Sequence, residues 1–407
     1  MRRLILALLA VVSLGTGLPA HAQTAQTPQP AATAAAVQAQ PDARRARANA
    51  RVFDRVWSMT RRIYYDPDFH GVDWEAARTT YRPRALAAAD EQALYSVLSE
   101  MMDRLDDAHA GVQSPTLSHY DRRRDQPRPL LGLLLLREKG GRYLVEDVRE
   151  GSPAESSEIE FGWELKTVNG QPFHPGRLFH AGVPVTAEFV DAAGAPRTLS
   201  LTPQLMPAPL RRNARFAAPD VLVISFDQFE RGIGRWVDRQ LRAAPAGTRV
   251  VLDLRNNRGG LVNEANNVLS CFLPPGQEWL RHRMRGRDEH AMRLRRGCRA
   301  YPGALAVLVN GGSRSAAELV PAVLQESGRA VIVGRRSAGD VLISMDYRLP
   351  DGGEISLSVA DLKTGKGTRL EHVGVTPDVE AHTTLADRRA GRDPALDAAV
   401  AAVRARP

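Results

Sequence analysis

A serine between a strand-like run and a helix-like run is the first feature of this sequence that could do chemistry. The stretch from Val307 to Glu318 reads VLVNGGSRSAAE. Its paired glycines, Gly311 and Gly312, permit a tight turn because glycine adopts backbone angles that are closed to other residues. A serine such as Ser315 is then held at the start of a helix, where the first amides have no partner within the helix. Acyl transfer needs such a fixed hydroxyl with backbone donors beside it.

The same residues allow a simpler interpretation. Ser313 or Ser315 could only cap the helix, since serine is a preferred N-cap residue. Short serine motifs also occur often without any catalytic role. The nucleophile hypothesis therefore depends on what the rest of the chain supplies.

The composition is that of a soluble globular protein. The chain has 407 residues, of which 43% are hydrophobic and 25% charged, with a formal net charge of +9. This length predicts two or three domains. The basic residues are scattered, and no aromatic-interleaved basic stripe accompanies them, which argues against a nucleic-acid partner. No HExxH motif, clustered Cys/His ligand spacing or phosphate loop occurs, so we expect no metal or cofactor.

The N-terminus has the pattern of a secretory signal peptide. Arg2 and Arg3 precede an apolar run over residues 4–14, and residues 20–22 (AHA) form a small-x-small cleavage site. The run is too short for a membrane span, and no later segment is long and apolar enough for one. We therefore expect residues 1–22 to be removed on export, which means the periplasm in a Gram-negative source or otherwise secretion.

The two cysteines, Cys271 and Cys298, would then lie in an oxidising compartment, where such a pair is a disulfide candidate. The segment between them is rich in Arg, Gly and Pro and is expected to be a surface loop. Two free thiols remain the alternative.

Changes in composition and hydrophobic periodicity divide the remaining chain into segments, as expected for a multidomain α/β protein. Residues 23–47, rich in Ala, Gln, Thr and Pro, read as a disordered linker. Residues 48–115 show helical periodicity, and residues 127–204 read as short strands with turn signals. In residues 207–387 strands alternate with helical runs, which predicts crossover connections, and residues 388–407 read as a tail with a short helix.

Several helices and strands can be placed within the third segment. Helices are expected at residues 232–241, 262–269 and 315–326, with Pro321 expected to kink the last one. The expected strands are residues 221–226, 250–254, 305–309, 330–333, 341–348 and 354–360.

Taken together, the separated motifs resemble the carboxy-terminal processing (tail-specific) protease family and its tricorn-like branch. The motifs are LDDAHAGV, LDLRNNRGG, NGGSRSAAE and EHVGVTPDVE, with PLLGLL, EGSPA and VNG between the first two. The resemblance implies an N-terminal helical bundle, a PDZ-like β module and a ClpP/crotonase-like α/β core. It also implies a serine-type peptidase.

The resemblance assigns roles to residues of the serine motif and the glycine loop. Ser315, three positions before Glu318, corresponds to the nucleophile. The amide of Ala316 would supply one oxyanion donor, and Gly259 or Gly260 would supply the other.

The general base is where the two branches differ. The tail-specific branch keeps a lysine where this chain has Asp340, and an aspartate with an ordinary pKa near about 4 is a poor base at neutral pH. The tricorn-like branch resembles a Ser-His-Glu arrangement, whose matches here are His109 and Glu371. The serine that precedes the histidine in that branch is Ala108 in this chain.

A neutral histidine can take the serine proton while an acid fixes its tautomer. His372, beside Glu371, is the main competing base. Lys363 and Lys366 are expected to be loop charges, although either could replace the missing lysine.

In a PDZ-like module an extended peptide end adds to a sheet edge, and a glycine-bearing loop receives its carboxylate. That loop would comprise Leu130, Leu131, Gly132 and Leu133. The sequence departs from the PDZ pattern at residues 155–160, where small and apolar residues are more usual.

The sequence therefore predicts an exported serine endopeptidase acting on polypeptides. Two other classes remain open: a PDZ-containing pseudoprotease that only binds peptides, and a small-ligand binding protein built on the same core.

Overall fold

The computed structural model describes residues 42–122, 126–137, 141–173, 175, 177–207 and 212–406. The predicted signal peptide and residues 23–41 of the predicted linker lie outside this part of the chain. The linker boundary at residue 47 is wrong, because α1 (Ala43–Ile63) already begins at Ala43. Asp42 caps this helix by accepting a hydrogen bond from the Arg45 backbone N–H at 2.7 Å.

The N-terminal region consists mainly of helices, as predicted. Helix α1 is followed by η1 (Phe69–Gly71), α2 (Trp74–Leu86), α3 (Glu91–Asp103) and α4 (Pro115–Arg122). The last of these lies almost wholly outside the predicted helical segment, which ended at residue 115. Asp73 and Asp90 cap α2 and α3 by accepting backbone N–H bonds at 2.9 and 2.7 Å.

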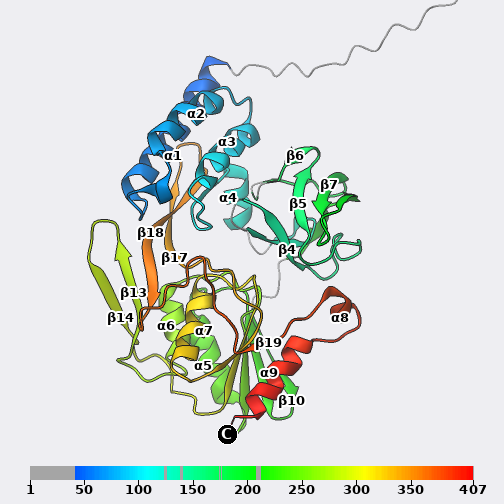
Figure 1. Cartoon of the computed structure of the whole chain (residues 1–407), viewed down its shortest axis with the longest axis vertical. Helices are drawn as coiled ribbons and strands as arrows, with labels where there is room; N and C mark the ends of the chain where they lie inside the picture. The colour runs from blue at the N-terminus through cyan, green and yellow to red at the C-terminus, as the bar shows by residue number, and fades with distance from the viewer. Residues whose placement is uncertain are drawn as a thin grey trace, which may run out of the picture. The chain divides into compact units, whose positions relative to one another are not determined.

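The core of this helical region is completed by strand residues from far along the chain. Ile355 and Leu357 of β18 (Glu354–Thr364) are fully buried against the helices. Strand β1 (Gly111–Gln113), which was not predicted, pairs antiparallel with the start of β18. The helices, drawn in blue and cyan in Figure 1, therefore share a core with a strand of the C-terminal half.

The next segment forms an antiparallel sheet with the order β3-β4-β5-β7-β8, with β6 pairing to β5. A separate pair is formed by β2 (Arg128–Leu130) and β9 (Gln204–Met206). The five-strand sheet and its extension comprise β3 (Leu133–Arg137), β4 (Tyr143–Val148), β5 (Glu164–Val168), β6 (Gln171–Pro172), β7 (Val185–Val190) and β8 (Pro196–Leu201).

The largest hydrophobic core surrounds a second sheet with the order β10-β11-β12-β15-β16-β19. All neighbours are parallel except β10 and β11. Its strands are β10 (Arg212–Ala218), β11 (Val221–Phe226), β12 (Arg249–Asp253), β15 (Leu305–Val309), β16 (Val331–Gly334) and β19 (Val379–Glu380).

Helices cover both faces of this sheet. Because side chains alternate along a strand, Leu222 and Ile224 of β11 face one core, which also contains residues of α5 (Ile233–Ala243), α6 (Val262–Leu269) and α7 (Ala316–Glu326). Val221 and Val223 face the other core, with α9 (Pro394–Arg404). The short helix expected within residues 388–407 is confirmed as α9, which follows α8 (Leu385–Arg389) and packs as a layer of the core.

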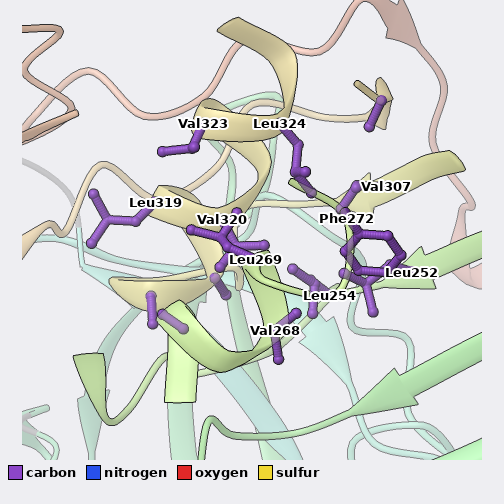
Figure 2. Packing of buried hydrophobic residues seen from close by; sticks show 14 of the residues in the cluster. Leu252, Leu254, Val268, Leu269, Phe272, Val307, Leu319, Val320, Val323 and Leu324 are labelled. Atoms are coloured by element: carbon purple, nitrogen blue, oxygen red, sulfur yellow. The ribbon is translucent and has the colours of Figure 1, made fainter. Parts of the chain in front are cut away.

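Helix α7 is anchored by the packing shown in Figure 2. Its residues Leu319, Val320, Val323 and Leu324 lie with Val268 and Leu269 of α6 and with Leu252 and Val307 of the sheet. The helix continues through Pro321, which is buried. This packing fixes the helix start, where Ser315 lies.

A third sheet combines strands from distant parts of the chain. Strand β18 pairs with β17 (Leu342–Arg348) on one side and with β1 and β13 (Glu278–Met284) on the other, while β14 (Glu289–Arg293) extends β13. The segment between the cysteines was expected to be a surface loop, and it instead contributes the β13–β14 hairpin. Strand β13 of this hairpin pairs antiparallel with the distant strand β18.

The structure joins Cys271 and Cys298 in a disulfide. No helix in the described part of the chain combines the length and apolar character needed to cross a bilayer.

Candidate active site

Ser315 lies where β15 turns into α7. Its backbone angles are φ 56° and ψ −117°, whereas an ordinary N-cap residue has extended angles. This region of backbone space is nearly closed to residues other than glycine, and such outliers concentrate at functional sites. The serine is therefore the N-cap residue, as the simpler interpretation required, but in a conformation that capping alone does not need.

The neighbouring Ser313 has a structural role. It is fully buried, its hydroxyl donates to the Leu254 carbonyl at 2.8 Å and it accepts from the Asn310 backbone N–H at 3.0 Å. Ser315 is only half-buried. Of the two candidate nucleophiles, Ser315 has the accessible hydroxyl.

Glu318 holds the Ser315 turn against the segment that contains Asp340. Its Oε2 accepts from the backbone N–H groups of Ser315 (2.9 Å) and Asp340 (3.0 Å). Its Oε1 accepts from the Ser337 hydroxyl and the Gly339 N–H, both at 2.6 Å. Burial raises the Glu318 pKa to about 7, although these hydrogen bonds favour the ionised form. The sequence motif marked this glutamate, but the spacing gave no sign of its distant partners.

The loop after β12 approaches the serine closely. A Cβ on Gly259 would lie 2.6 Å from the Ser315 Cβ and from the Arg314 oxygen, so only glycine fits there. The backbone N–H of Gly259 donates to Asn257 Oδ1 at 2.9 Å. The Arg314 N–H donates to the Asn257 oxygen at 2.9 Å, which ties the loop to the serine turn.

Two backbone amides near the serine remain available. Within the described residues, the N–H groups of Gly260 and Ala316 donate to no protein acceptor. Ala316 is the first residue of α7, where the helix dipole favours negative charge. Of the two loop glycines, Gly260 is therefore the one whose N–H is available, because Gly259 already donates to Asn257.

His109 lies in the loop between α3 and β1. Its backbone N–H donates to Asp107 Oδ1 at 2.7 Å, and its ring Nδ1 is buried without a hydrogen-bond partner in the described structure. Burial lowers the pKa of His109, while the charges of Asp107 and Asp340 oppose that shift. The imidazole is therefore neutral at neutral pH, as a general base must be.

Asp340 connects the histidine and serine regions. Its backbone oxygen accepts from the Ser315 N–H at 2.9 Å, and its carboxylate lies 3.2 Å from the Arg314 guanidinium. The Asp340 side chain is thus part of an ion pair with Arg314, the residue before Ser315.

Glu371 is buried beside this segment. Its Oε2 accepts from the Val341 backbone N–H, and its Oε1 lies 3.7 Å from His372 Nε2. Burial raises the Glu371 pKa to about 8; the Val341 hydrogen bond opposes the shift, and nearby acidic groups add to it. Glu371 does not bond to the His109 Nδ1, which has no partner. Asp107, which sequence reasoning did not select, is the charged group with the largest effect on the His109 pKa, which it raises.

The two lysines considered as replacement bases have other partners. Lys363 Nζ lies 3.1 Å from Glu289 Oε2, and Lys366 donates to the Glu326 backbone oxygen. Both lysines contact residues outside the Ser315 turn.

A cavity of about 720 Å³ lies between two sheets: the antiparallel sheet that contains β3 and β4, and the sheet that contains β11, β12 and β15, which we call the central sheet. The predicted peptide-binding residues Leu130, Leu131, Gly132 and Leu133 all line it, together with charged residues such as Arg335. A Cβ on Gly132 would overlap the Ser152 side chain, so this position requires glycine. Ser315, His109 and Glu371 are not among the lining residues.

Known proteins resemble this chain in sequence and in fold. Residues 220–381 match the model of peptidase family S41, and residues 46–103 match the tricorn protease C1 domain. A carboxyl-terminal-processing peptidase 3, chloroplastic, of Arabidopsis thaliana is 26% identical over 83% of this chain and 70% of its own length. Tricorn protease homolog 1 of Streptomyces coelicolor is 30% identical over 86% of this chain, which spans about a third of that protein (34%).

Among solved structures, a photosystem II D1 C-terminal processing protease has the same fold. The TM-score is 0.63 at 24% sequence identity, over 82% of this chain and 93% of that one. From the matched domains, these relatives and the shared fold, we conclude that the chain belongs to the carboxyl-terminal processing protease family and is a serine-type peptidase.

Proposed function

We propose that this protein is an exported serine endopeptidase that cleaves polypeptides at Ser315. The observation that carries the proposal is the strained Ser315 at the start of α7, with the unpartnered amides of Ala316 and Gly260 nearby. Preorganised amides of this kind stabilise the oxyanion of the tetrahedral intermediate, which is often the largest contribution to acyl-transfer catalysis.

In the proposed reaction, Ser315 attacks the peptide carbonyl carbon while His109 takes the hydroxyl proton. His109 then gives the proton to the departing amine, and water repeats the sequence on the acyl-enzyme. Glu371 is the acid of the proposed triad. Its partner Val341 follows Asp340, whose oxygen accepts from the Ser315 N–H. For Glu371 to bond to His109, the imidazole or the carboxyl group must shift when substrate binds, since apo catalytic contacts are often long.

The domain assignments belong to the same proposal. Residues 207–387, extended by α9, would form a ClpP/crotonase-like core, and residues 127–204 a PDZ-like module. The unpaired side of β3 and the Leu130–Leu133 loop both border the cavity, which suits an extended chain end that adds to a sheet edge. The Cys271–Cys298 disulfide supports export, because such bonds persist in oxidising compartments.

A serine-directed phosphonate probe tests this function. We expect the probe to label Ser315, and we expect Ser315→Ala to abolish labelling and peptide hydrolysis while the circular dichroism spectrum is retained. Ser58→Ala, which removes an exposed hydroxyl of α1, serves as the control. Labelling at Ser313, or no labelling of the wild-type protein, would contradict the proposal.

A further inference from the structure

Two consecutive acidic residues of the antiparallel sheet, Glu146 and Asp147 on β4, contact both loops that build the candidate active site. Consecutive side chains of a regular strand point to opposite faces. The β3–β4 register, however, shifts: Leu134 pairs with Asp147 and Leu135 with Val145, which leaves Glu146 as an extra residue. Such a bulge redirects side chains, and it explains how both carboxylates reach the central sheet.

Glu146 contacts the turn that carries the nucleophile. It is 6% exposed, and its Oε1 accepts from the Gly311 backbone N–H at 3.0 Å and lies 3.2 Å from the Arg335 guanidinium. A Cβ on Gly311 would lie 2.7 Å from the Glu146 carboxyl carbon, so the glycine allows this approach. Arg314, next to the nucleophile, also donates to the Leu135 oxygen of the adjacent strand at 3.3 Å.

Asp147 contacts the loop that carries the oxyanion amides. Its Oδ2 accepts from the side-chain amide of Asn256, and its Oδ1 lies 2.7 Å from the Arg388 guanidinium. Asn256 has a positive φ of 58°. It also exchanges two hydrogen bonds with Asn310, at 2.9 and 2.8 Å, which link the oxyanion loop to the nucleophile turn.

We propose that Glu146 and Asp147 are positioning residues that set Ser315 and the oxyanion amides at their working separation. The inference rests on the proposed function, because it presumes that Ser315 reacts. Neither carboxylate takes part in the chemistry. Each carboxylate holds one of the two loops, and both lie on β4, which is outside the central sheet. A small shift of β4 would therefore displace Ser315 relative to the oxyanion amides. Even a small displacement of reacting groups slows a reaction strongly.

The sharpest test exchanges the two members of the Asp147–Asn256 hydrogen bond. Asn256→Asp alone places two carboxylates against each other, while an aspartate still tolerates the positive φ. Combining it with Asp147→Asn restores a donor and an acceptor, now in reverse order. The asparagine oxygen at position 147 can still accept from Arg388, and the aspartate at position 256 can still accept from Asn310.

The measured quantity is the second-order rate of Ser315 labelling by the small phosphonate probe, with hydrolysis of a peptide in parallel. We expect Asn256→Asp to slow labelling about 10- to 100-fold, as for the loss of a charge-assisted hydrogen bond, and the double variant to recover most of that loss. Labelling of Asn256→Asp at the wild-type rate, or a folded double variant as slow as Asn256→Asp, would overturn the inference.

Glu146→Gln provides a second test that does not depend on the folding of Asn256→Asp. The isosteric amide is a weaker acceptor for the Gly311 N–H and cannot pair with Arg335 as an ion, so we expect labelling about tenfold slower. Glu158→Gln, an exposed residue of the same module, is the control, and the unfolding temperatures of both variants are compared. Equal labelling rates in the two variants would overturn the inference.

The wild-type protein separates this inference from the proposed function. If the wild type is not labelled at Ser315, the proposed function fails. If the wild type is labelled but Asn256→Asp and Glu146→Gln have no effect, only the positioning role fails.

Discussion

The environment of His109 determines how activity should depend on pH. Burial disfavours the imidazolium and lowers the pKa of His109 from its ordinary value of 6.5, and the charges of Asp107 and Asp340 only oppose this shift. The neutral ring is the form that accepts the Ser315 proton. As the proposed base, His109 is therefore neutral and able to accept a proton at a lower pH than an unperturbed histidine would be.

We predict that kcat/KM rises with pH through an ionisation below 6.5, the ordinary histidine value, which is separate from any change near pH 8 where Glu371 loses its proton. His109→Ala should lose several orders of magnitude, comparable with Ser315→Ala, because such residues act as a unit. Asp340→Ala should lose far less, since Ser315 bonds to the backbone of Asp340 and not to its side chain. A pH–rate profile of the wild type and both variants checks this, and a profile without an ionisation below 6.5 would exclude His109 as the base.

At the scale of the elements, local sequence signals predicted some features well. The expected helix at residues 262–269 coincides with α6, and α7 differs from its expected range only at Ser315. Glycine and serine motifs also located the turn and loop of the candidate site, because their backbone demands are local.

Features that depend on long-range pairing were missed. The β13–β14 hairpin lies in an Arg-rich segment, and its stability comes from pairing with β18, which is distant in sequence. For the same reason the role of Glu318 could not be predicted, because three of its four hydrogen-bond partners lie 19 to 22 residues further along. The absence of a Glu371–His109 contact is likewise a matter of tertiary geometry.

The disulfide closes the segment that carries this hairpin. Cys271 follows α6, and the bond spans a sequence separation of 27. We predict that replacing both cysteines by serine lowers the free energy of unfolding by about 3 kcal/mol, mainly because the unfolded chain regains entropy. Denaturant unfolding of the double variant, with the reduced wild type for comparison, measures this difference. Two alkyl adducts on the unreduced wild type would show free thiols and refute the bond.

At the scale of the whole molecule, buried carboxyl groups make stability depend on pH. Burial raises the Glu371 pKa from 4.5 to about 8. The folded protein therefore holds this proton over a pH range in which the unfolded chain has lost it. The stabilisation is fully present below pH 4.5 and is lost as the pH rises through about 8.

We predict that Glu371→Gln becomes more stable relative to the wild type as the pH increases from 4.5 towards 8. The difference should grow by at most roughly 1.4 kcal/mol per pH unit, which is the linkage value for one proton. The glutamine oxygen can still accept from the Val341 N–H. Thermal unfolding across this range measures the trend, with Glu158→Gln as an exposed control. A difference independent of pH would show that Glu371 ionises alike in both states.

The backbone conformation of Ser315 has a consequence for evolution and engineering of this protein. At φ 56° and ψ −117° a glycine fits without strain, whereas any side chain costs about 1–2 kcal/mol. Because glycine also gains entropy in the unfolded chain, the net advantage is smaller. We predict that Ser315→Gly unfolds at a higher temperature than Ser315→Ala, although both are inactive. Equal unfolding temperatures would show that the strain is no larger than the entropic cost of glycine. Selection for stability alone would therefore replace this serine by glycine, because the serine lowers the unfolding temperature of the protein.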